Sequence, residues 1–293
     1  MAPHAALLPD GKRLHLNHGP IDLIIEGFGD QKEIENSYRA AAGRFQTILD
    51  ELVAELPALR RAYSPAQSFS GAVASRMANA VAPYALDDRL FVTPMAAVAG
   101  AVGDEILAAM LASSNLDKAY VNNGGDIALH LAVGESFDVA LAAVPKDPLL
   151  IGQAEVSADD GIGGIATSSR HGRSLSLGIA DSVTVLAKNA AAGDIAATII
   201  ANHVSLEAHP AIVRCPASEI DPDSDLGDKL VVQAVGKLSP NDIHAALSKG
   251  LEEAQRIAKI GRIKAAALYL ENKFEIIGLR ARQSDRDFLY QLG

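Results

Sequence analysis

The stretch from Thr93 to Ser113 constrains the fold more than any other part of the sequence, because it is rich in alanine and glycine and holds few polar residues. Thr93 and Pro94 suit a helix N-cap followed by proline at the first helical position, so we expect a helix over about 95–113. The segment Gly103–Glu105 interrupts its apolar run, which falls short of the roughly 20 apolar residues of a membrane span. Small residues let a helix approach another backbone closely. The sequence therefore predicts a helix packed inside the protein.

The composition points to an aliphatic core. The chain has no tryptophan and only 4% aromatic residues, whereas 49% of its residues are hydrophobic and 21% are charged. These proportions are typical of a globular protein and exclude extensive disorder. A chain of 293 residues is long enough to bury a large core without disulfides or a structural metal. We expect one domain over 1–293, with a division into two subdomains near 115–120 as the alternative.

Hydrophobic periodicity indicates helices and strands that do not alternate regularly. The first helix is expected to end near Pro57, and the strand at 137–144 to pair with the strand at 126–133 across Gly134. Pro145 and Pro148 indicate a loop. The mixture predicts an α+β fold. Strands are expected at 21–26, 119–122, 126–133, 137–144, 163–168, 182–187, 230–235, 263–270 and 274–277, and helices at 34–56, 71–81, 95–113, 189–202 and 240–260.

Charge and cysteine content exclude several classes of function. The net charge of −10 and the sequence pI of about 5.2 argue against a general nucleic-acid binder. Cys215 is the only cysteine, so it can form neither an internal disulfide nor a Cys-rich zinc site. The N-terminal residues have no basic segment, and their apolar run is too short for a signal peptide. We expect a cytoplasmic protein that does not engage a membrane, and homo-oligomerisation stays open.

The segment Val121–Ile127 carries the first candidate site. It holds Asn123, Gly124, Gly125 and Asp126 directly after an expected strand. Paired glycines allow the backbone to approach a ligand, and their N–H groups can face an anion. The alternative is a plain hairpin turn with hydrogen bonds from the Asn and Asp side chains. The segment alone favours the turn by about two to one.

The segment Gly163–Arg173 carries the second candidate site. It is a basic loop with hydroxyl groups in an acidic chain, and it could hold a phosphate or pyrophosphate through arginine forks and hydroxyls. The alternative is an exposed loop whose cations face water, and the two readings are about equal. A Ser-His-Asp hydrolase fits poorly because the Gly-x-Ser-x-Gly elbow is absent. The residues concerned are Ser168, Ser169, Arg170, His171 and Arg173.

The segment Gly193–Ile200 carries the third candidate site. Asp194 and Thr198 are four residues apart, so they share one face of a helix. A carboxylate and a hydroxyl are hard oxygen ligands that suit Mg²⁺ held together with substrate phosphates. The alternative is an Asp favoured by the helix dipole and a Thr packed in the core. The pair alone favours this alternative by about three to one.

Taken in order, these segments resemble the ApbE-like family of FAD:protein FMN transferases. The resemblance covers roughly 93–202, and the order and spacing of five segments carry it. The whole chain is more similar to an uncharacterised cytoplasmic branch, once labelled thiamine-biosynthesis-like. The resemblance implies an ApbE-like fold of mixed sheets with packed helices. The five segments are Pro94–Gly100, Asn123–Ile127, Ile165–Ser169, Asp181–Val185 and Gly193–Thr198.

The resemblance also implies roles for residues. The Asn-Gly-Gly segment of the family lines the flavin site, and the Asp and Thr bind Mg²⁺ on the FAD pyrophosphate while FMN passes to a Ser or Thr hydroxyl of a target flavoprotein. Asp194 and Thr198 would then be the metal ligands. With the motif residues above, the candidate residues for binding FAD or FMN, or a related nucleotide, are Asn123, Gly124, Gly125, Asp126, Thr167, Ser168, Ser169 and Arg170.

One stretch departs from the family pattern. The family's His-Ile-Ile-Asp-Pro-x-Thr-Gly stretch should precede the strand that begins at Ser182, but this chain has Ser174–Ala180 there, without His, Pro or Thr-Gly. Residues expected near the acceptor hydroxyl are therefore missing. Two hypotheses follow, namely a Mg²⁺-dependent transferase that acts at a pyrophosphate-linked cofactor and a non-catalytic flavin- or pterin-binding protein on the same scaffold. A purely structural homo-oligomer is a third, weaker hypothesis.

Overall fold

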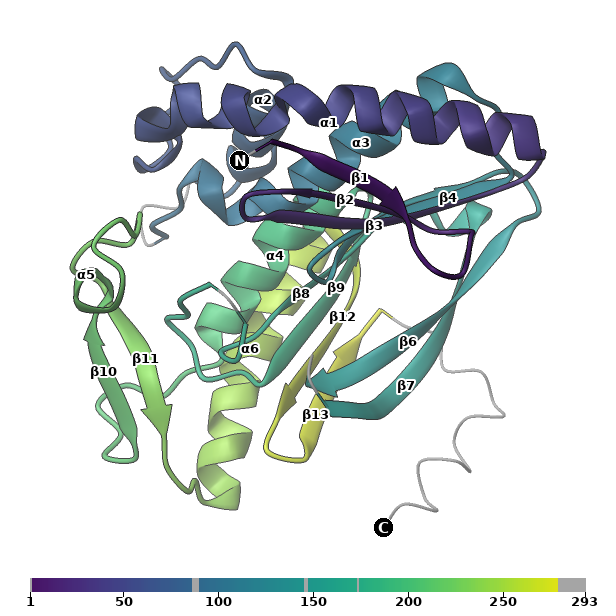
Figure 1. Cartoon of the computed structure of the whole chain (residues 1–293). Helices are drawn as coiled ribbons and strands as arrows, with labels where there is room; N and C mark the ends of the chain where they lie inside the picture. The colour runs from purple at the N-terminus through teal and green to yellow at the C-terminus, as the bar shows by residue number, and fades with distance from the viewer. Residues whose placement is uncertain (1, 86–89, 145–146, 173, 279–293) are drawn as a thin grey trace.

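One antiparallel sheet of nine strands runs through the molecule (Figure 1). The computed structural model describes residues 2–85, 90–144, 147–172 and 174–278. The predicted α+β class is confirmed, because helices and an antiparallel sheet combine without a parallel crossover pattern. In spatial order the strands are β1 (His4–Leu7), β2 (Leu14–His18), β3 (Ile21–Phe28), β4 (Lys118–Asn123), β5 (Asp126–Leu131), β8 (Gly164–Ser168), β9 (Ser182–Ala187), β12 (Ile263–Leu270) and β13 (Lys273–Ile277).

The long helices cover one face of this sheet and enclose two apolar clusters. One cluster lies between β2, β3 and β4 and the helices α1 and α3, and the other between β8, β9 and β12 and the helices α4 and α6. The sheet continues from β4 through β5 to β8; the choice between one domain and two subdomains stays a prediction. The helices are α1 (Gln31–Leu59), α2 (Ala72–Val81), α3 (Val98–Ser113), α4 (Ala190–His203), α5 (Ala217–Ile220) and α6 (Pro240–Lys259), with the 3-10 turns η1 (Pro94–Ala97) and η2 (Ala158–Asp160).

The hairpin of β6 (Ser136–Val144) and β7 (Asp147–Ser157) lies on the opposite face. The predicted pairing of 137–144 with 126–133 is wrong, because β8 occupies that edge of β5 and β6 pairs with β7 instead. The loop predicted at Pro145 and Pro148 is wrong at Pro148, which lies in β7, while Pro145 lies outside the described residues. A two-stranded sheet has two free edges, where a missing N–H is tolerated. Val156 anchors this hairpin in a small apolar cluster with Ile165 and Leu186.

The helix α1 continues past the proline at which we expected it to end. Pro57 lies in its last turn. Val53, whose carbonyl loses its partner there, is exposed, and the following Leu59 is fully buried. The buried leucine therefore holds the final turn against the core. The helix begins at Gln31, before the expected residue 34, and the Asp30 side chain caps it by accepting hydrogen bonds from the N–H groups of Lys32 and Glu33.

A second hairpin, of β10 (Ile212–Pro216) and β11 (Leu230–Val235), projects at one end of the molecule (Figure 1). Strand β10 was not predicted. The N–H of Val232 donates to the carbonyl of Ser176 at 2.8 Å, which ties the hairpin to the main body. Cys215 lies on β10 and is partly exposed. The acidic loop between the two strands reaches back to the main body, where Asp225 accepts a hydrogen bond from the Thr93 hydroxyl.

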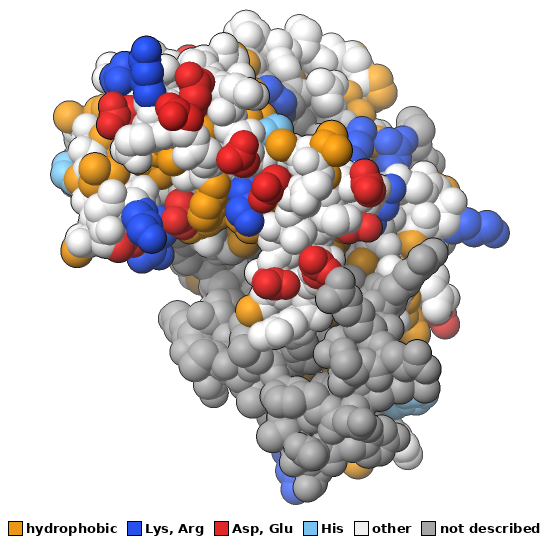
Figure 2. Space-filling model, turned by 90° about the vertical axis from the view of Figure 1, so that its right-hand side faces the viewer, with side chains coloured by type: hydrophobic (Ala, Val, Ile, Leu, Met, Phe, Trp, Pro, Cys, Tyr) orange, Lys and Arg blue, Asp and Glu red, His pale blue; other side chains and the backbone are white. Residues whose placement is uncertain are grey.

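Within the described part of the chain, one helical stretch, Pro94–Ser113, is long and apolar enough to cross a membrane by length and composition alone. Half of its most apolar window is buried inside the protein, and α3 packs against α1, α4 and β4. It is therefore the internal helix that the sequence predicts. On the face in Figure 2, the coloured side chains of Lys and Arg are interspersed with those of Asp and Glu.

Candidate functional site

The Asn-Gly-Gly segment forms the tight turn between β4 and β5. Gly124 and Gly125 have φ angles of 67° and 110°, which favour glycine at both positions. The Asn122 side chain accepts a hydrogen bond from the N–H of Gly125 at 2.9 Å. The hairpin turn predicted as the alternative to a ligand site is thus confirmed. As predicted, an Asn side chain takes part in its hydrogen bonds.

The same turn contacts the first residues of α3. Asn123 is buried, and its side-chain amide donates to the carbonyl of Ala99 at 3.1 Å. The N–H of the next residue, Gly100, donates to the carboxylate of Asp194 at 3.0 Å. The turn after β4 and the acid on α4 therefore meet at two consecutive residues of α3. This is the proximity that a shared ligand site requires.

Asp126, at the other end of the turn, connects β5 to β8. Its carboxylate accepts a hydrogen bond from the N–H of Thr167 at 3.2 Å. The Thr167 hydroxyl lies 3.0 Å from the Thr184 hydroxyl on β9. Asn123, Asp126 and Thr167 are thus brought into one connected region, and their polar groups also serve the structure.

Helix α4 exposes a single polar stripe. Nine of its 14 residues are buried, whereas Asp194 and Thr198 are partly exposed and lie one turn apart. Among the described residues, none forms a hydrogen bond with the Thr198 hydroxyl in the structure. A carboxylate and an unpaired hydroxyl on one accessible stripe match the spacing predicted for the third candidate site.

The surroundings of Asp194 change the pKa of its carboxyl group. Burial raises the pKa of Asp194 to about 7, and the nearby charge of Asp104 raises it further. The N–H groups of Gly100 and Ala99 act in the opposite direction, because they stabilise the carboxylate. A carboxylate that is partly desolvated without a cationic partner would gain from a divalent cation, because the cation compensates the lost hydration.

The protein offers an incomplete set of ligands for a metal. In the ranges that the structure describes, no group of three or more His, Cys, Asp or Glu side chains could hold a metal ion. Mg²⁺ commonly binds through one or two protein carboxylates and takes its other ligands from water and substrate phosphates. Asp194 and Thr198 fit that mode of binding.

The basic loop after β8 is held by Asp181. The guanidinium of Arg170 lies 2.8 Å from its carboxylate, and the His171 imidazole lies 3.0 Å from the same oxygen. Asp181 also accepts from the N–H of Glu271 at 2.8 Å, and the Ser169 hydroxyl accepts from the N–H of His171 at 3.0 Å. The structure thus gives Arg170 and Ser169 internal partners. Their role in phosphate binding stays a prediction, as does that of the partly exposed Ser168, and Arg173 lies outside the described residues.

Sequence reasoning missed two contributors to this region. Asp104 on α3 accepts hydrogen bonds from the N–H groups of Ala190 and Ala191, both at 2.9 Å. The sequence signal for this role is an acid within an apolar helix. In the sequence analysis this acid serves only as an interruption of the apolar run. The contact of Asp225 with Thr93 has no local signal, because 132 residues separate the partners.

Comparisons with known proteins agree with the motif pattern. The chain is 35% identical over 178 residues to a UPF0280 protein of Methanopyrus kandleri, which covers 60% of this chain and 68% of that protein. It is 32% identical over 174 residues to a UPF0280 protein of Methanococcus vannielii, covering 57% and 66%.

Among solved structures, a mutant of the flavin transferase ApbE from Vibrio cholerae matches 94% of this chain and 99% of that chain, with 13% identity and a TM-score of 0.48. The apo flavinyl transferase ApbE of Pseudomonas stutzeri matches 94% and 95%, with 13% identity and a TM-score of 0.44. A family model described as AbpE bacteria matches residues 5–276. Because this match spans nearly the whole chain, the protein belongs to that family.

Proposed function

We propose that the protein is a Mg²⁺-dependent enzyme that binds FAD and acts at its pyrophosphate, in the manner of an FMN transferase. One observation carries the proposal: Asn123 and Asp194 bind the consecutive residues Ala99 and Gly100 at the start of α3. The glycine turn and the helical acid, remote in sequence, thereby border the same region. The resemblance of the motifs to those of FAD:protein FMN transferases supports a flavin as the ligand.

Each group has a task in this proposal. Asp194 and Thr198 hold Mg²⁺, which would neutralise the charge that develops on the pyrophosphate as its bond breaks. The turn Asn123–Asp126 would line the flavin-bearing part of FAD, because its glycines place no side chains there. A hydroxyl acceptor would form an ester bond to the phosphorus next to the flavin ribityl chain as the P–O–P bond breaks, with AMP as the leaving group and the hydroxyl proton released to solvent. The acceptor is a hydroxyl of a target flavoprotein.

A second candidate function rests on the segment that replaces the family's His-Ile-Ile-Asp-Pro-x-Thr-Gly stretch. Ile179 is fully buried, and a Cβ on Gly178 would overlap the backbone of Ala201 on α4. The N–H of Leu177 donates to the side chain of Asn202 at 3.1 Å. This segment is occupied in packing against α4. It favours a protein that binds a flavin or pterin without transferring it, on the thiamine-biosynthesis-like branch.

Flavin fluorescence and product analysis separate these functions. The full chain is titrated with FAD with and without MgCl₂, and the mixture is then analysed for AMP and FMN by chromatography. We expect Mg²⁺-dependent binding, followed by release of AMP once a candidate acceptor flavoprotein is added. Asp194→Asn should abolish the Mg²⁺ dependence, whereas Asp159→Asn, an exposed acid in η2, should leave it unchanged.

Each result has a defined meaning. Tight binding of FAD without AMP, even with candidate flavoproteins added, would favour the binding protein over the transferase. Absence of FAD binding under all conditions, or an Asp194→Asn variant that matches the wild type, would overturn the proposed site. Circular dichroism of both variants checks that the fold is retained.

A further inference from the structure

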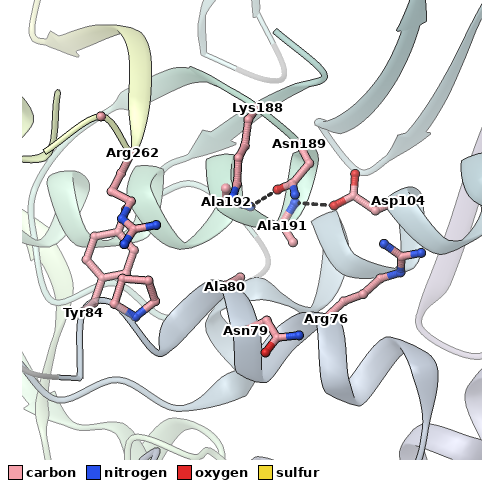
Figure 3. A pocket seen from close by; sticks show the side chains of 12 residues that line it. Arg76, Asn79, Ala80, Tyr84, Asp104, Lys188, Asn189, Ala191, Ala192 and Arg262 are labelled. Carbon is pink, nitrogen blue, oxygen red and sulfur yellow. Dashed lines mark hydrogen bonds between the residues drawn. The ribbon is translucent and has the colours of Figure 1, made fainter. Parts of the chain in front are cut away.

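A pocket of about 200 Å³ lies at the N-terminus of α4, outside the residues assigned to FAD and Mg²⁺ (Figure 3). It is lined by α2 and the residues that follow it, by α3, by the start of α4 with the connection from β9, and by the turn from α6 to β12. Neither Asp194 nor the Asn-Gly-Gly turn lines it. The pocket is therefore a separate feature of the molecule.

Three cationic side chains line the pocket, and they come from three different segments: Arg76, Lys188 and Arg262. Arg76 lies 2.8 Å from Glu105, which it shares with Arg44. Across the described ranges, the side chains of Lys188 and Arg262 have no ion pair or hydrogen bond. Cations left without counter-charges are notable in a chain with a net charge of −10, because they create a local attraction for anions.

The single acid that lines the pocket does not cancel this attraction. Asp104 is buried, and its two carboxylate oxygens accept from the N–H groups of Ala190 and Ala191. The nearby N-terminal end of α4 adds partial positive charge. Lys188 and Arg262 are exposed, whereas the acid is buried and its carboxylate is bound to the helix.

Apolar groups form another part of the wall. Tyr84 is 3% exposed, and burial raises its pKa to about 12, so the phenol stays neutral. Pro83 and Ala80 lie beside it in the lining. In Figure 3 Arg262 lies next to Tyr84, Arg76 lies near Asp104, and Lys188 lies between these two ends. The pocket therefore combines cations with an uncharged ring.

We propose that this pocket binds a small phosphate monoester, with its phosphate between Lys188 and Arg262 and its organic group against Tyr84. Guanidinium forks bind phosphate through paired hydrogen bonds, and a lysine adds a point charge. The volume is below the roughly 300–1,000 Å³ of sites for drug-sized ligands, so the organic group is small. This inference does not depend on the proposed function, because it uses none of the FAD or Mg²⁺ residues.

Calorimetric titration of the full chain with phenyl phosphate, inorganic phosphate and acetate tests the proposal. We expect phenyl phosphate to bind more tightly than inorganic phosphate, and acetate to bind weakly. Arg262→Gln and Lys188→Gln should each weaken phenyl phosphate on the order of tenfold, as loss of one charge-assisted hydrogen bond implies. Lys259→Gln removes the same charge from an exposed position in the last turn of α6, outside the pocket, and should have no effect.

Three results would overturn the proposal: no binding of phenyl phosphate at millimolar concentration, an equal loss of affinity in Lys259→Gln, or acetate binding as tightly as the phosphates. Asp194→Asn must retain phenyl phosphate binding, and Arg262→Gln must retain any Mg²⁺-dependent FAD binding. Competition between FAD and phenyl phosphate would show that the pocket belongs to the FAD site, and would overturn its independence. Failure of this inference and failure of the proposed function are thus distinguishable.

Discussion

Asp104 and Asp194 cap each other's helices. Asp104, on α3, accepts the first N–H groups of α4 at 2.9 Å, and Asp194, on α4, accepts the N–H of Gly100 in the first turn of α3 at 3.0 Å. Each carboxylate lies at the positive end of the opposite helix, which favours its charge and satisfies N–H groups that a helix leaves without partners. The packing of α3 against α4 and the position of the candidate metal ligand Asp194 therefore both depend on these reciprocal hydrogen bonds.

Removing the buried member of this pair should destabilise the fold. Asp104→Ala leaves the N–H groups of Ala190 and Ala191 without their acceptor, and we expect a loss of about 1–3 kcal/mol in the free energy of unfolding. Urea unfolding followed by circular dichroism measures it. Asp30→Ala removes the exposed cap of α1 and should cost about 1 kcal/mol. A smaller loss for Asp104→Ala than for Asp30→Ala would contradict the reciprocal capping.

Two glycine substitutions should change stability in opposite directions. A Cβ on Gly100 would overlap the backbone of Ala190, so Gly100→Ala should force α3 and α4 apart at a cost of about 1–3 kcal/mol or more. Gly43 lies in α1 with no atom near its Cβ position, and Gly43→Ala should stabilise the protein by about 0.5–1 kcal/mol. Thermal unfolding of both variants suffices as the measurement, and equal signs would refute the close helix contact.

The stability of the metal-free protein should carry a pH signature of Asp194. Its pKa in the folded protein is about 7, above the ordinary value of 3.8, so the folded state holds a proton that the unfolded state has lost. The contribution of this group to stability is therefore complete below about pH 4 and is lost as the pH rises to about 7.

Urea unfolding of the wild type and Asp194→Asn across this pH range isolates the effect. The stability of the wild type relative to the variant should fall as the pH rises. At pH 7, added Mg²⁺ should raise the stability of the wild type alone, because a ligand stabilises the state that binds it. Parallel pH profiles for the two proteins would count against the raised pKa.

Thr198 should matter for the metal and not for the fold. Its hydroxyl has no hydrogen-bond partner within the described residues, so Thr198→Val should change the free energy of unfolding by less than about 0.5 kcal/mol. The same substitution should weaken Mg²⁺-dependent FAD binding, and Thr198→Ser should restore it. Unchanged FAD binding in Thr198→Val would exclude Thr198 as a ligand, although Asp194 could still bind the metal.

Local signals predicted much of the fold. The helix expected at 240–260 is α6 (Pro240–Lys259), with Ser239 as its N-cap, and paired glycines predicted the turn after β4. Local signals did not predict which strands pair with each other. Alternation in 137–144 gave a strand but not its neighbour, and β6 pairs with β7 because β8 takes the edge of β5. The continuation of α1 past Pro57 depends on tertiary burial of Leu59, which periodicity does not reveal.

The candidate site was predictable in its residue types and not in its contacts. The spacing of Asp194 and Thr198 placed them on one helical face, as the structure shows. The reciprocal role of Asp104 and the commitment of Arg170 to Asp181 depend on contacts between elements. Such contacts can be identified only in the structure, because hydrogen-bond partners far apart in the chain produce no periodic pattern in the sequence.

The one cysteine of the chain offers a practical handle. Cys215 is partly exposed on β10. Within the loop of the same hairpin, Asp225 accepts a hydrogen bond from Thr93, which directly precedes η1. A maleimide fluorophore would attach at this single thiol without any engineered substitution. A change in its emission on addition of a ligand would show that the hairpin moves relative to the start of α3 when the ligand binds.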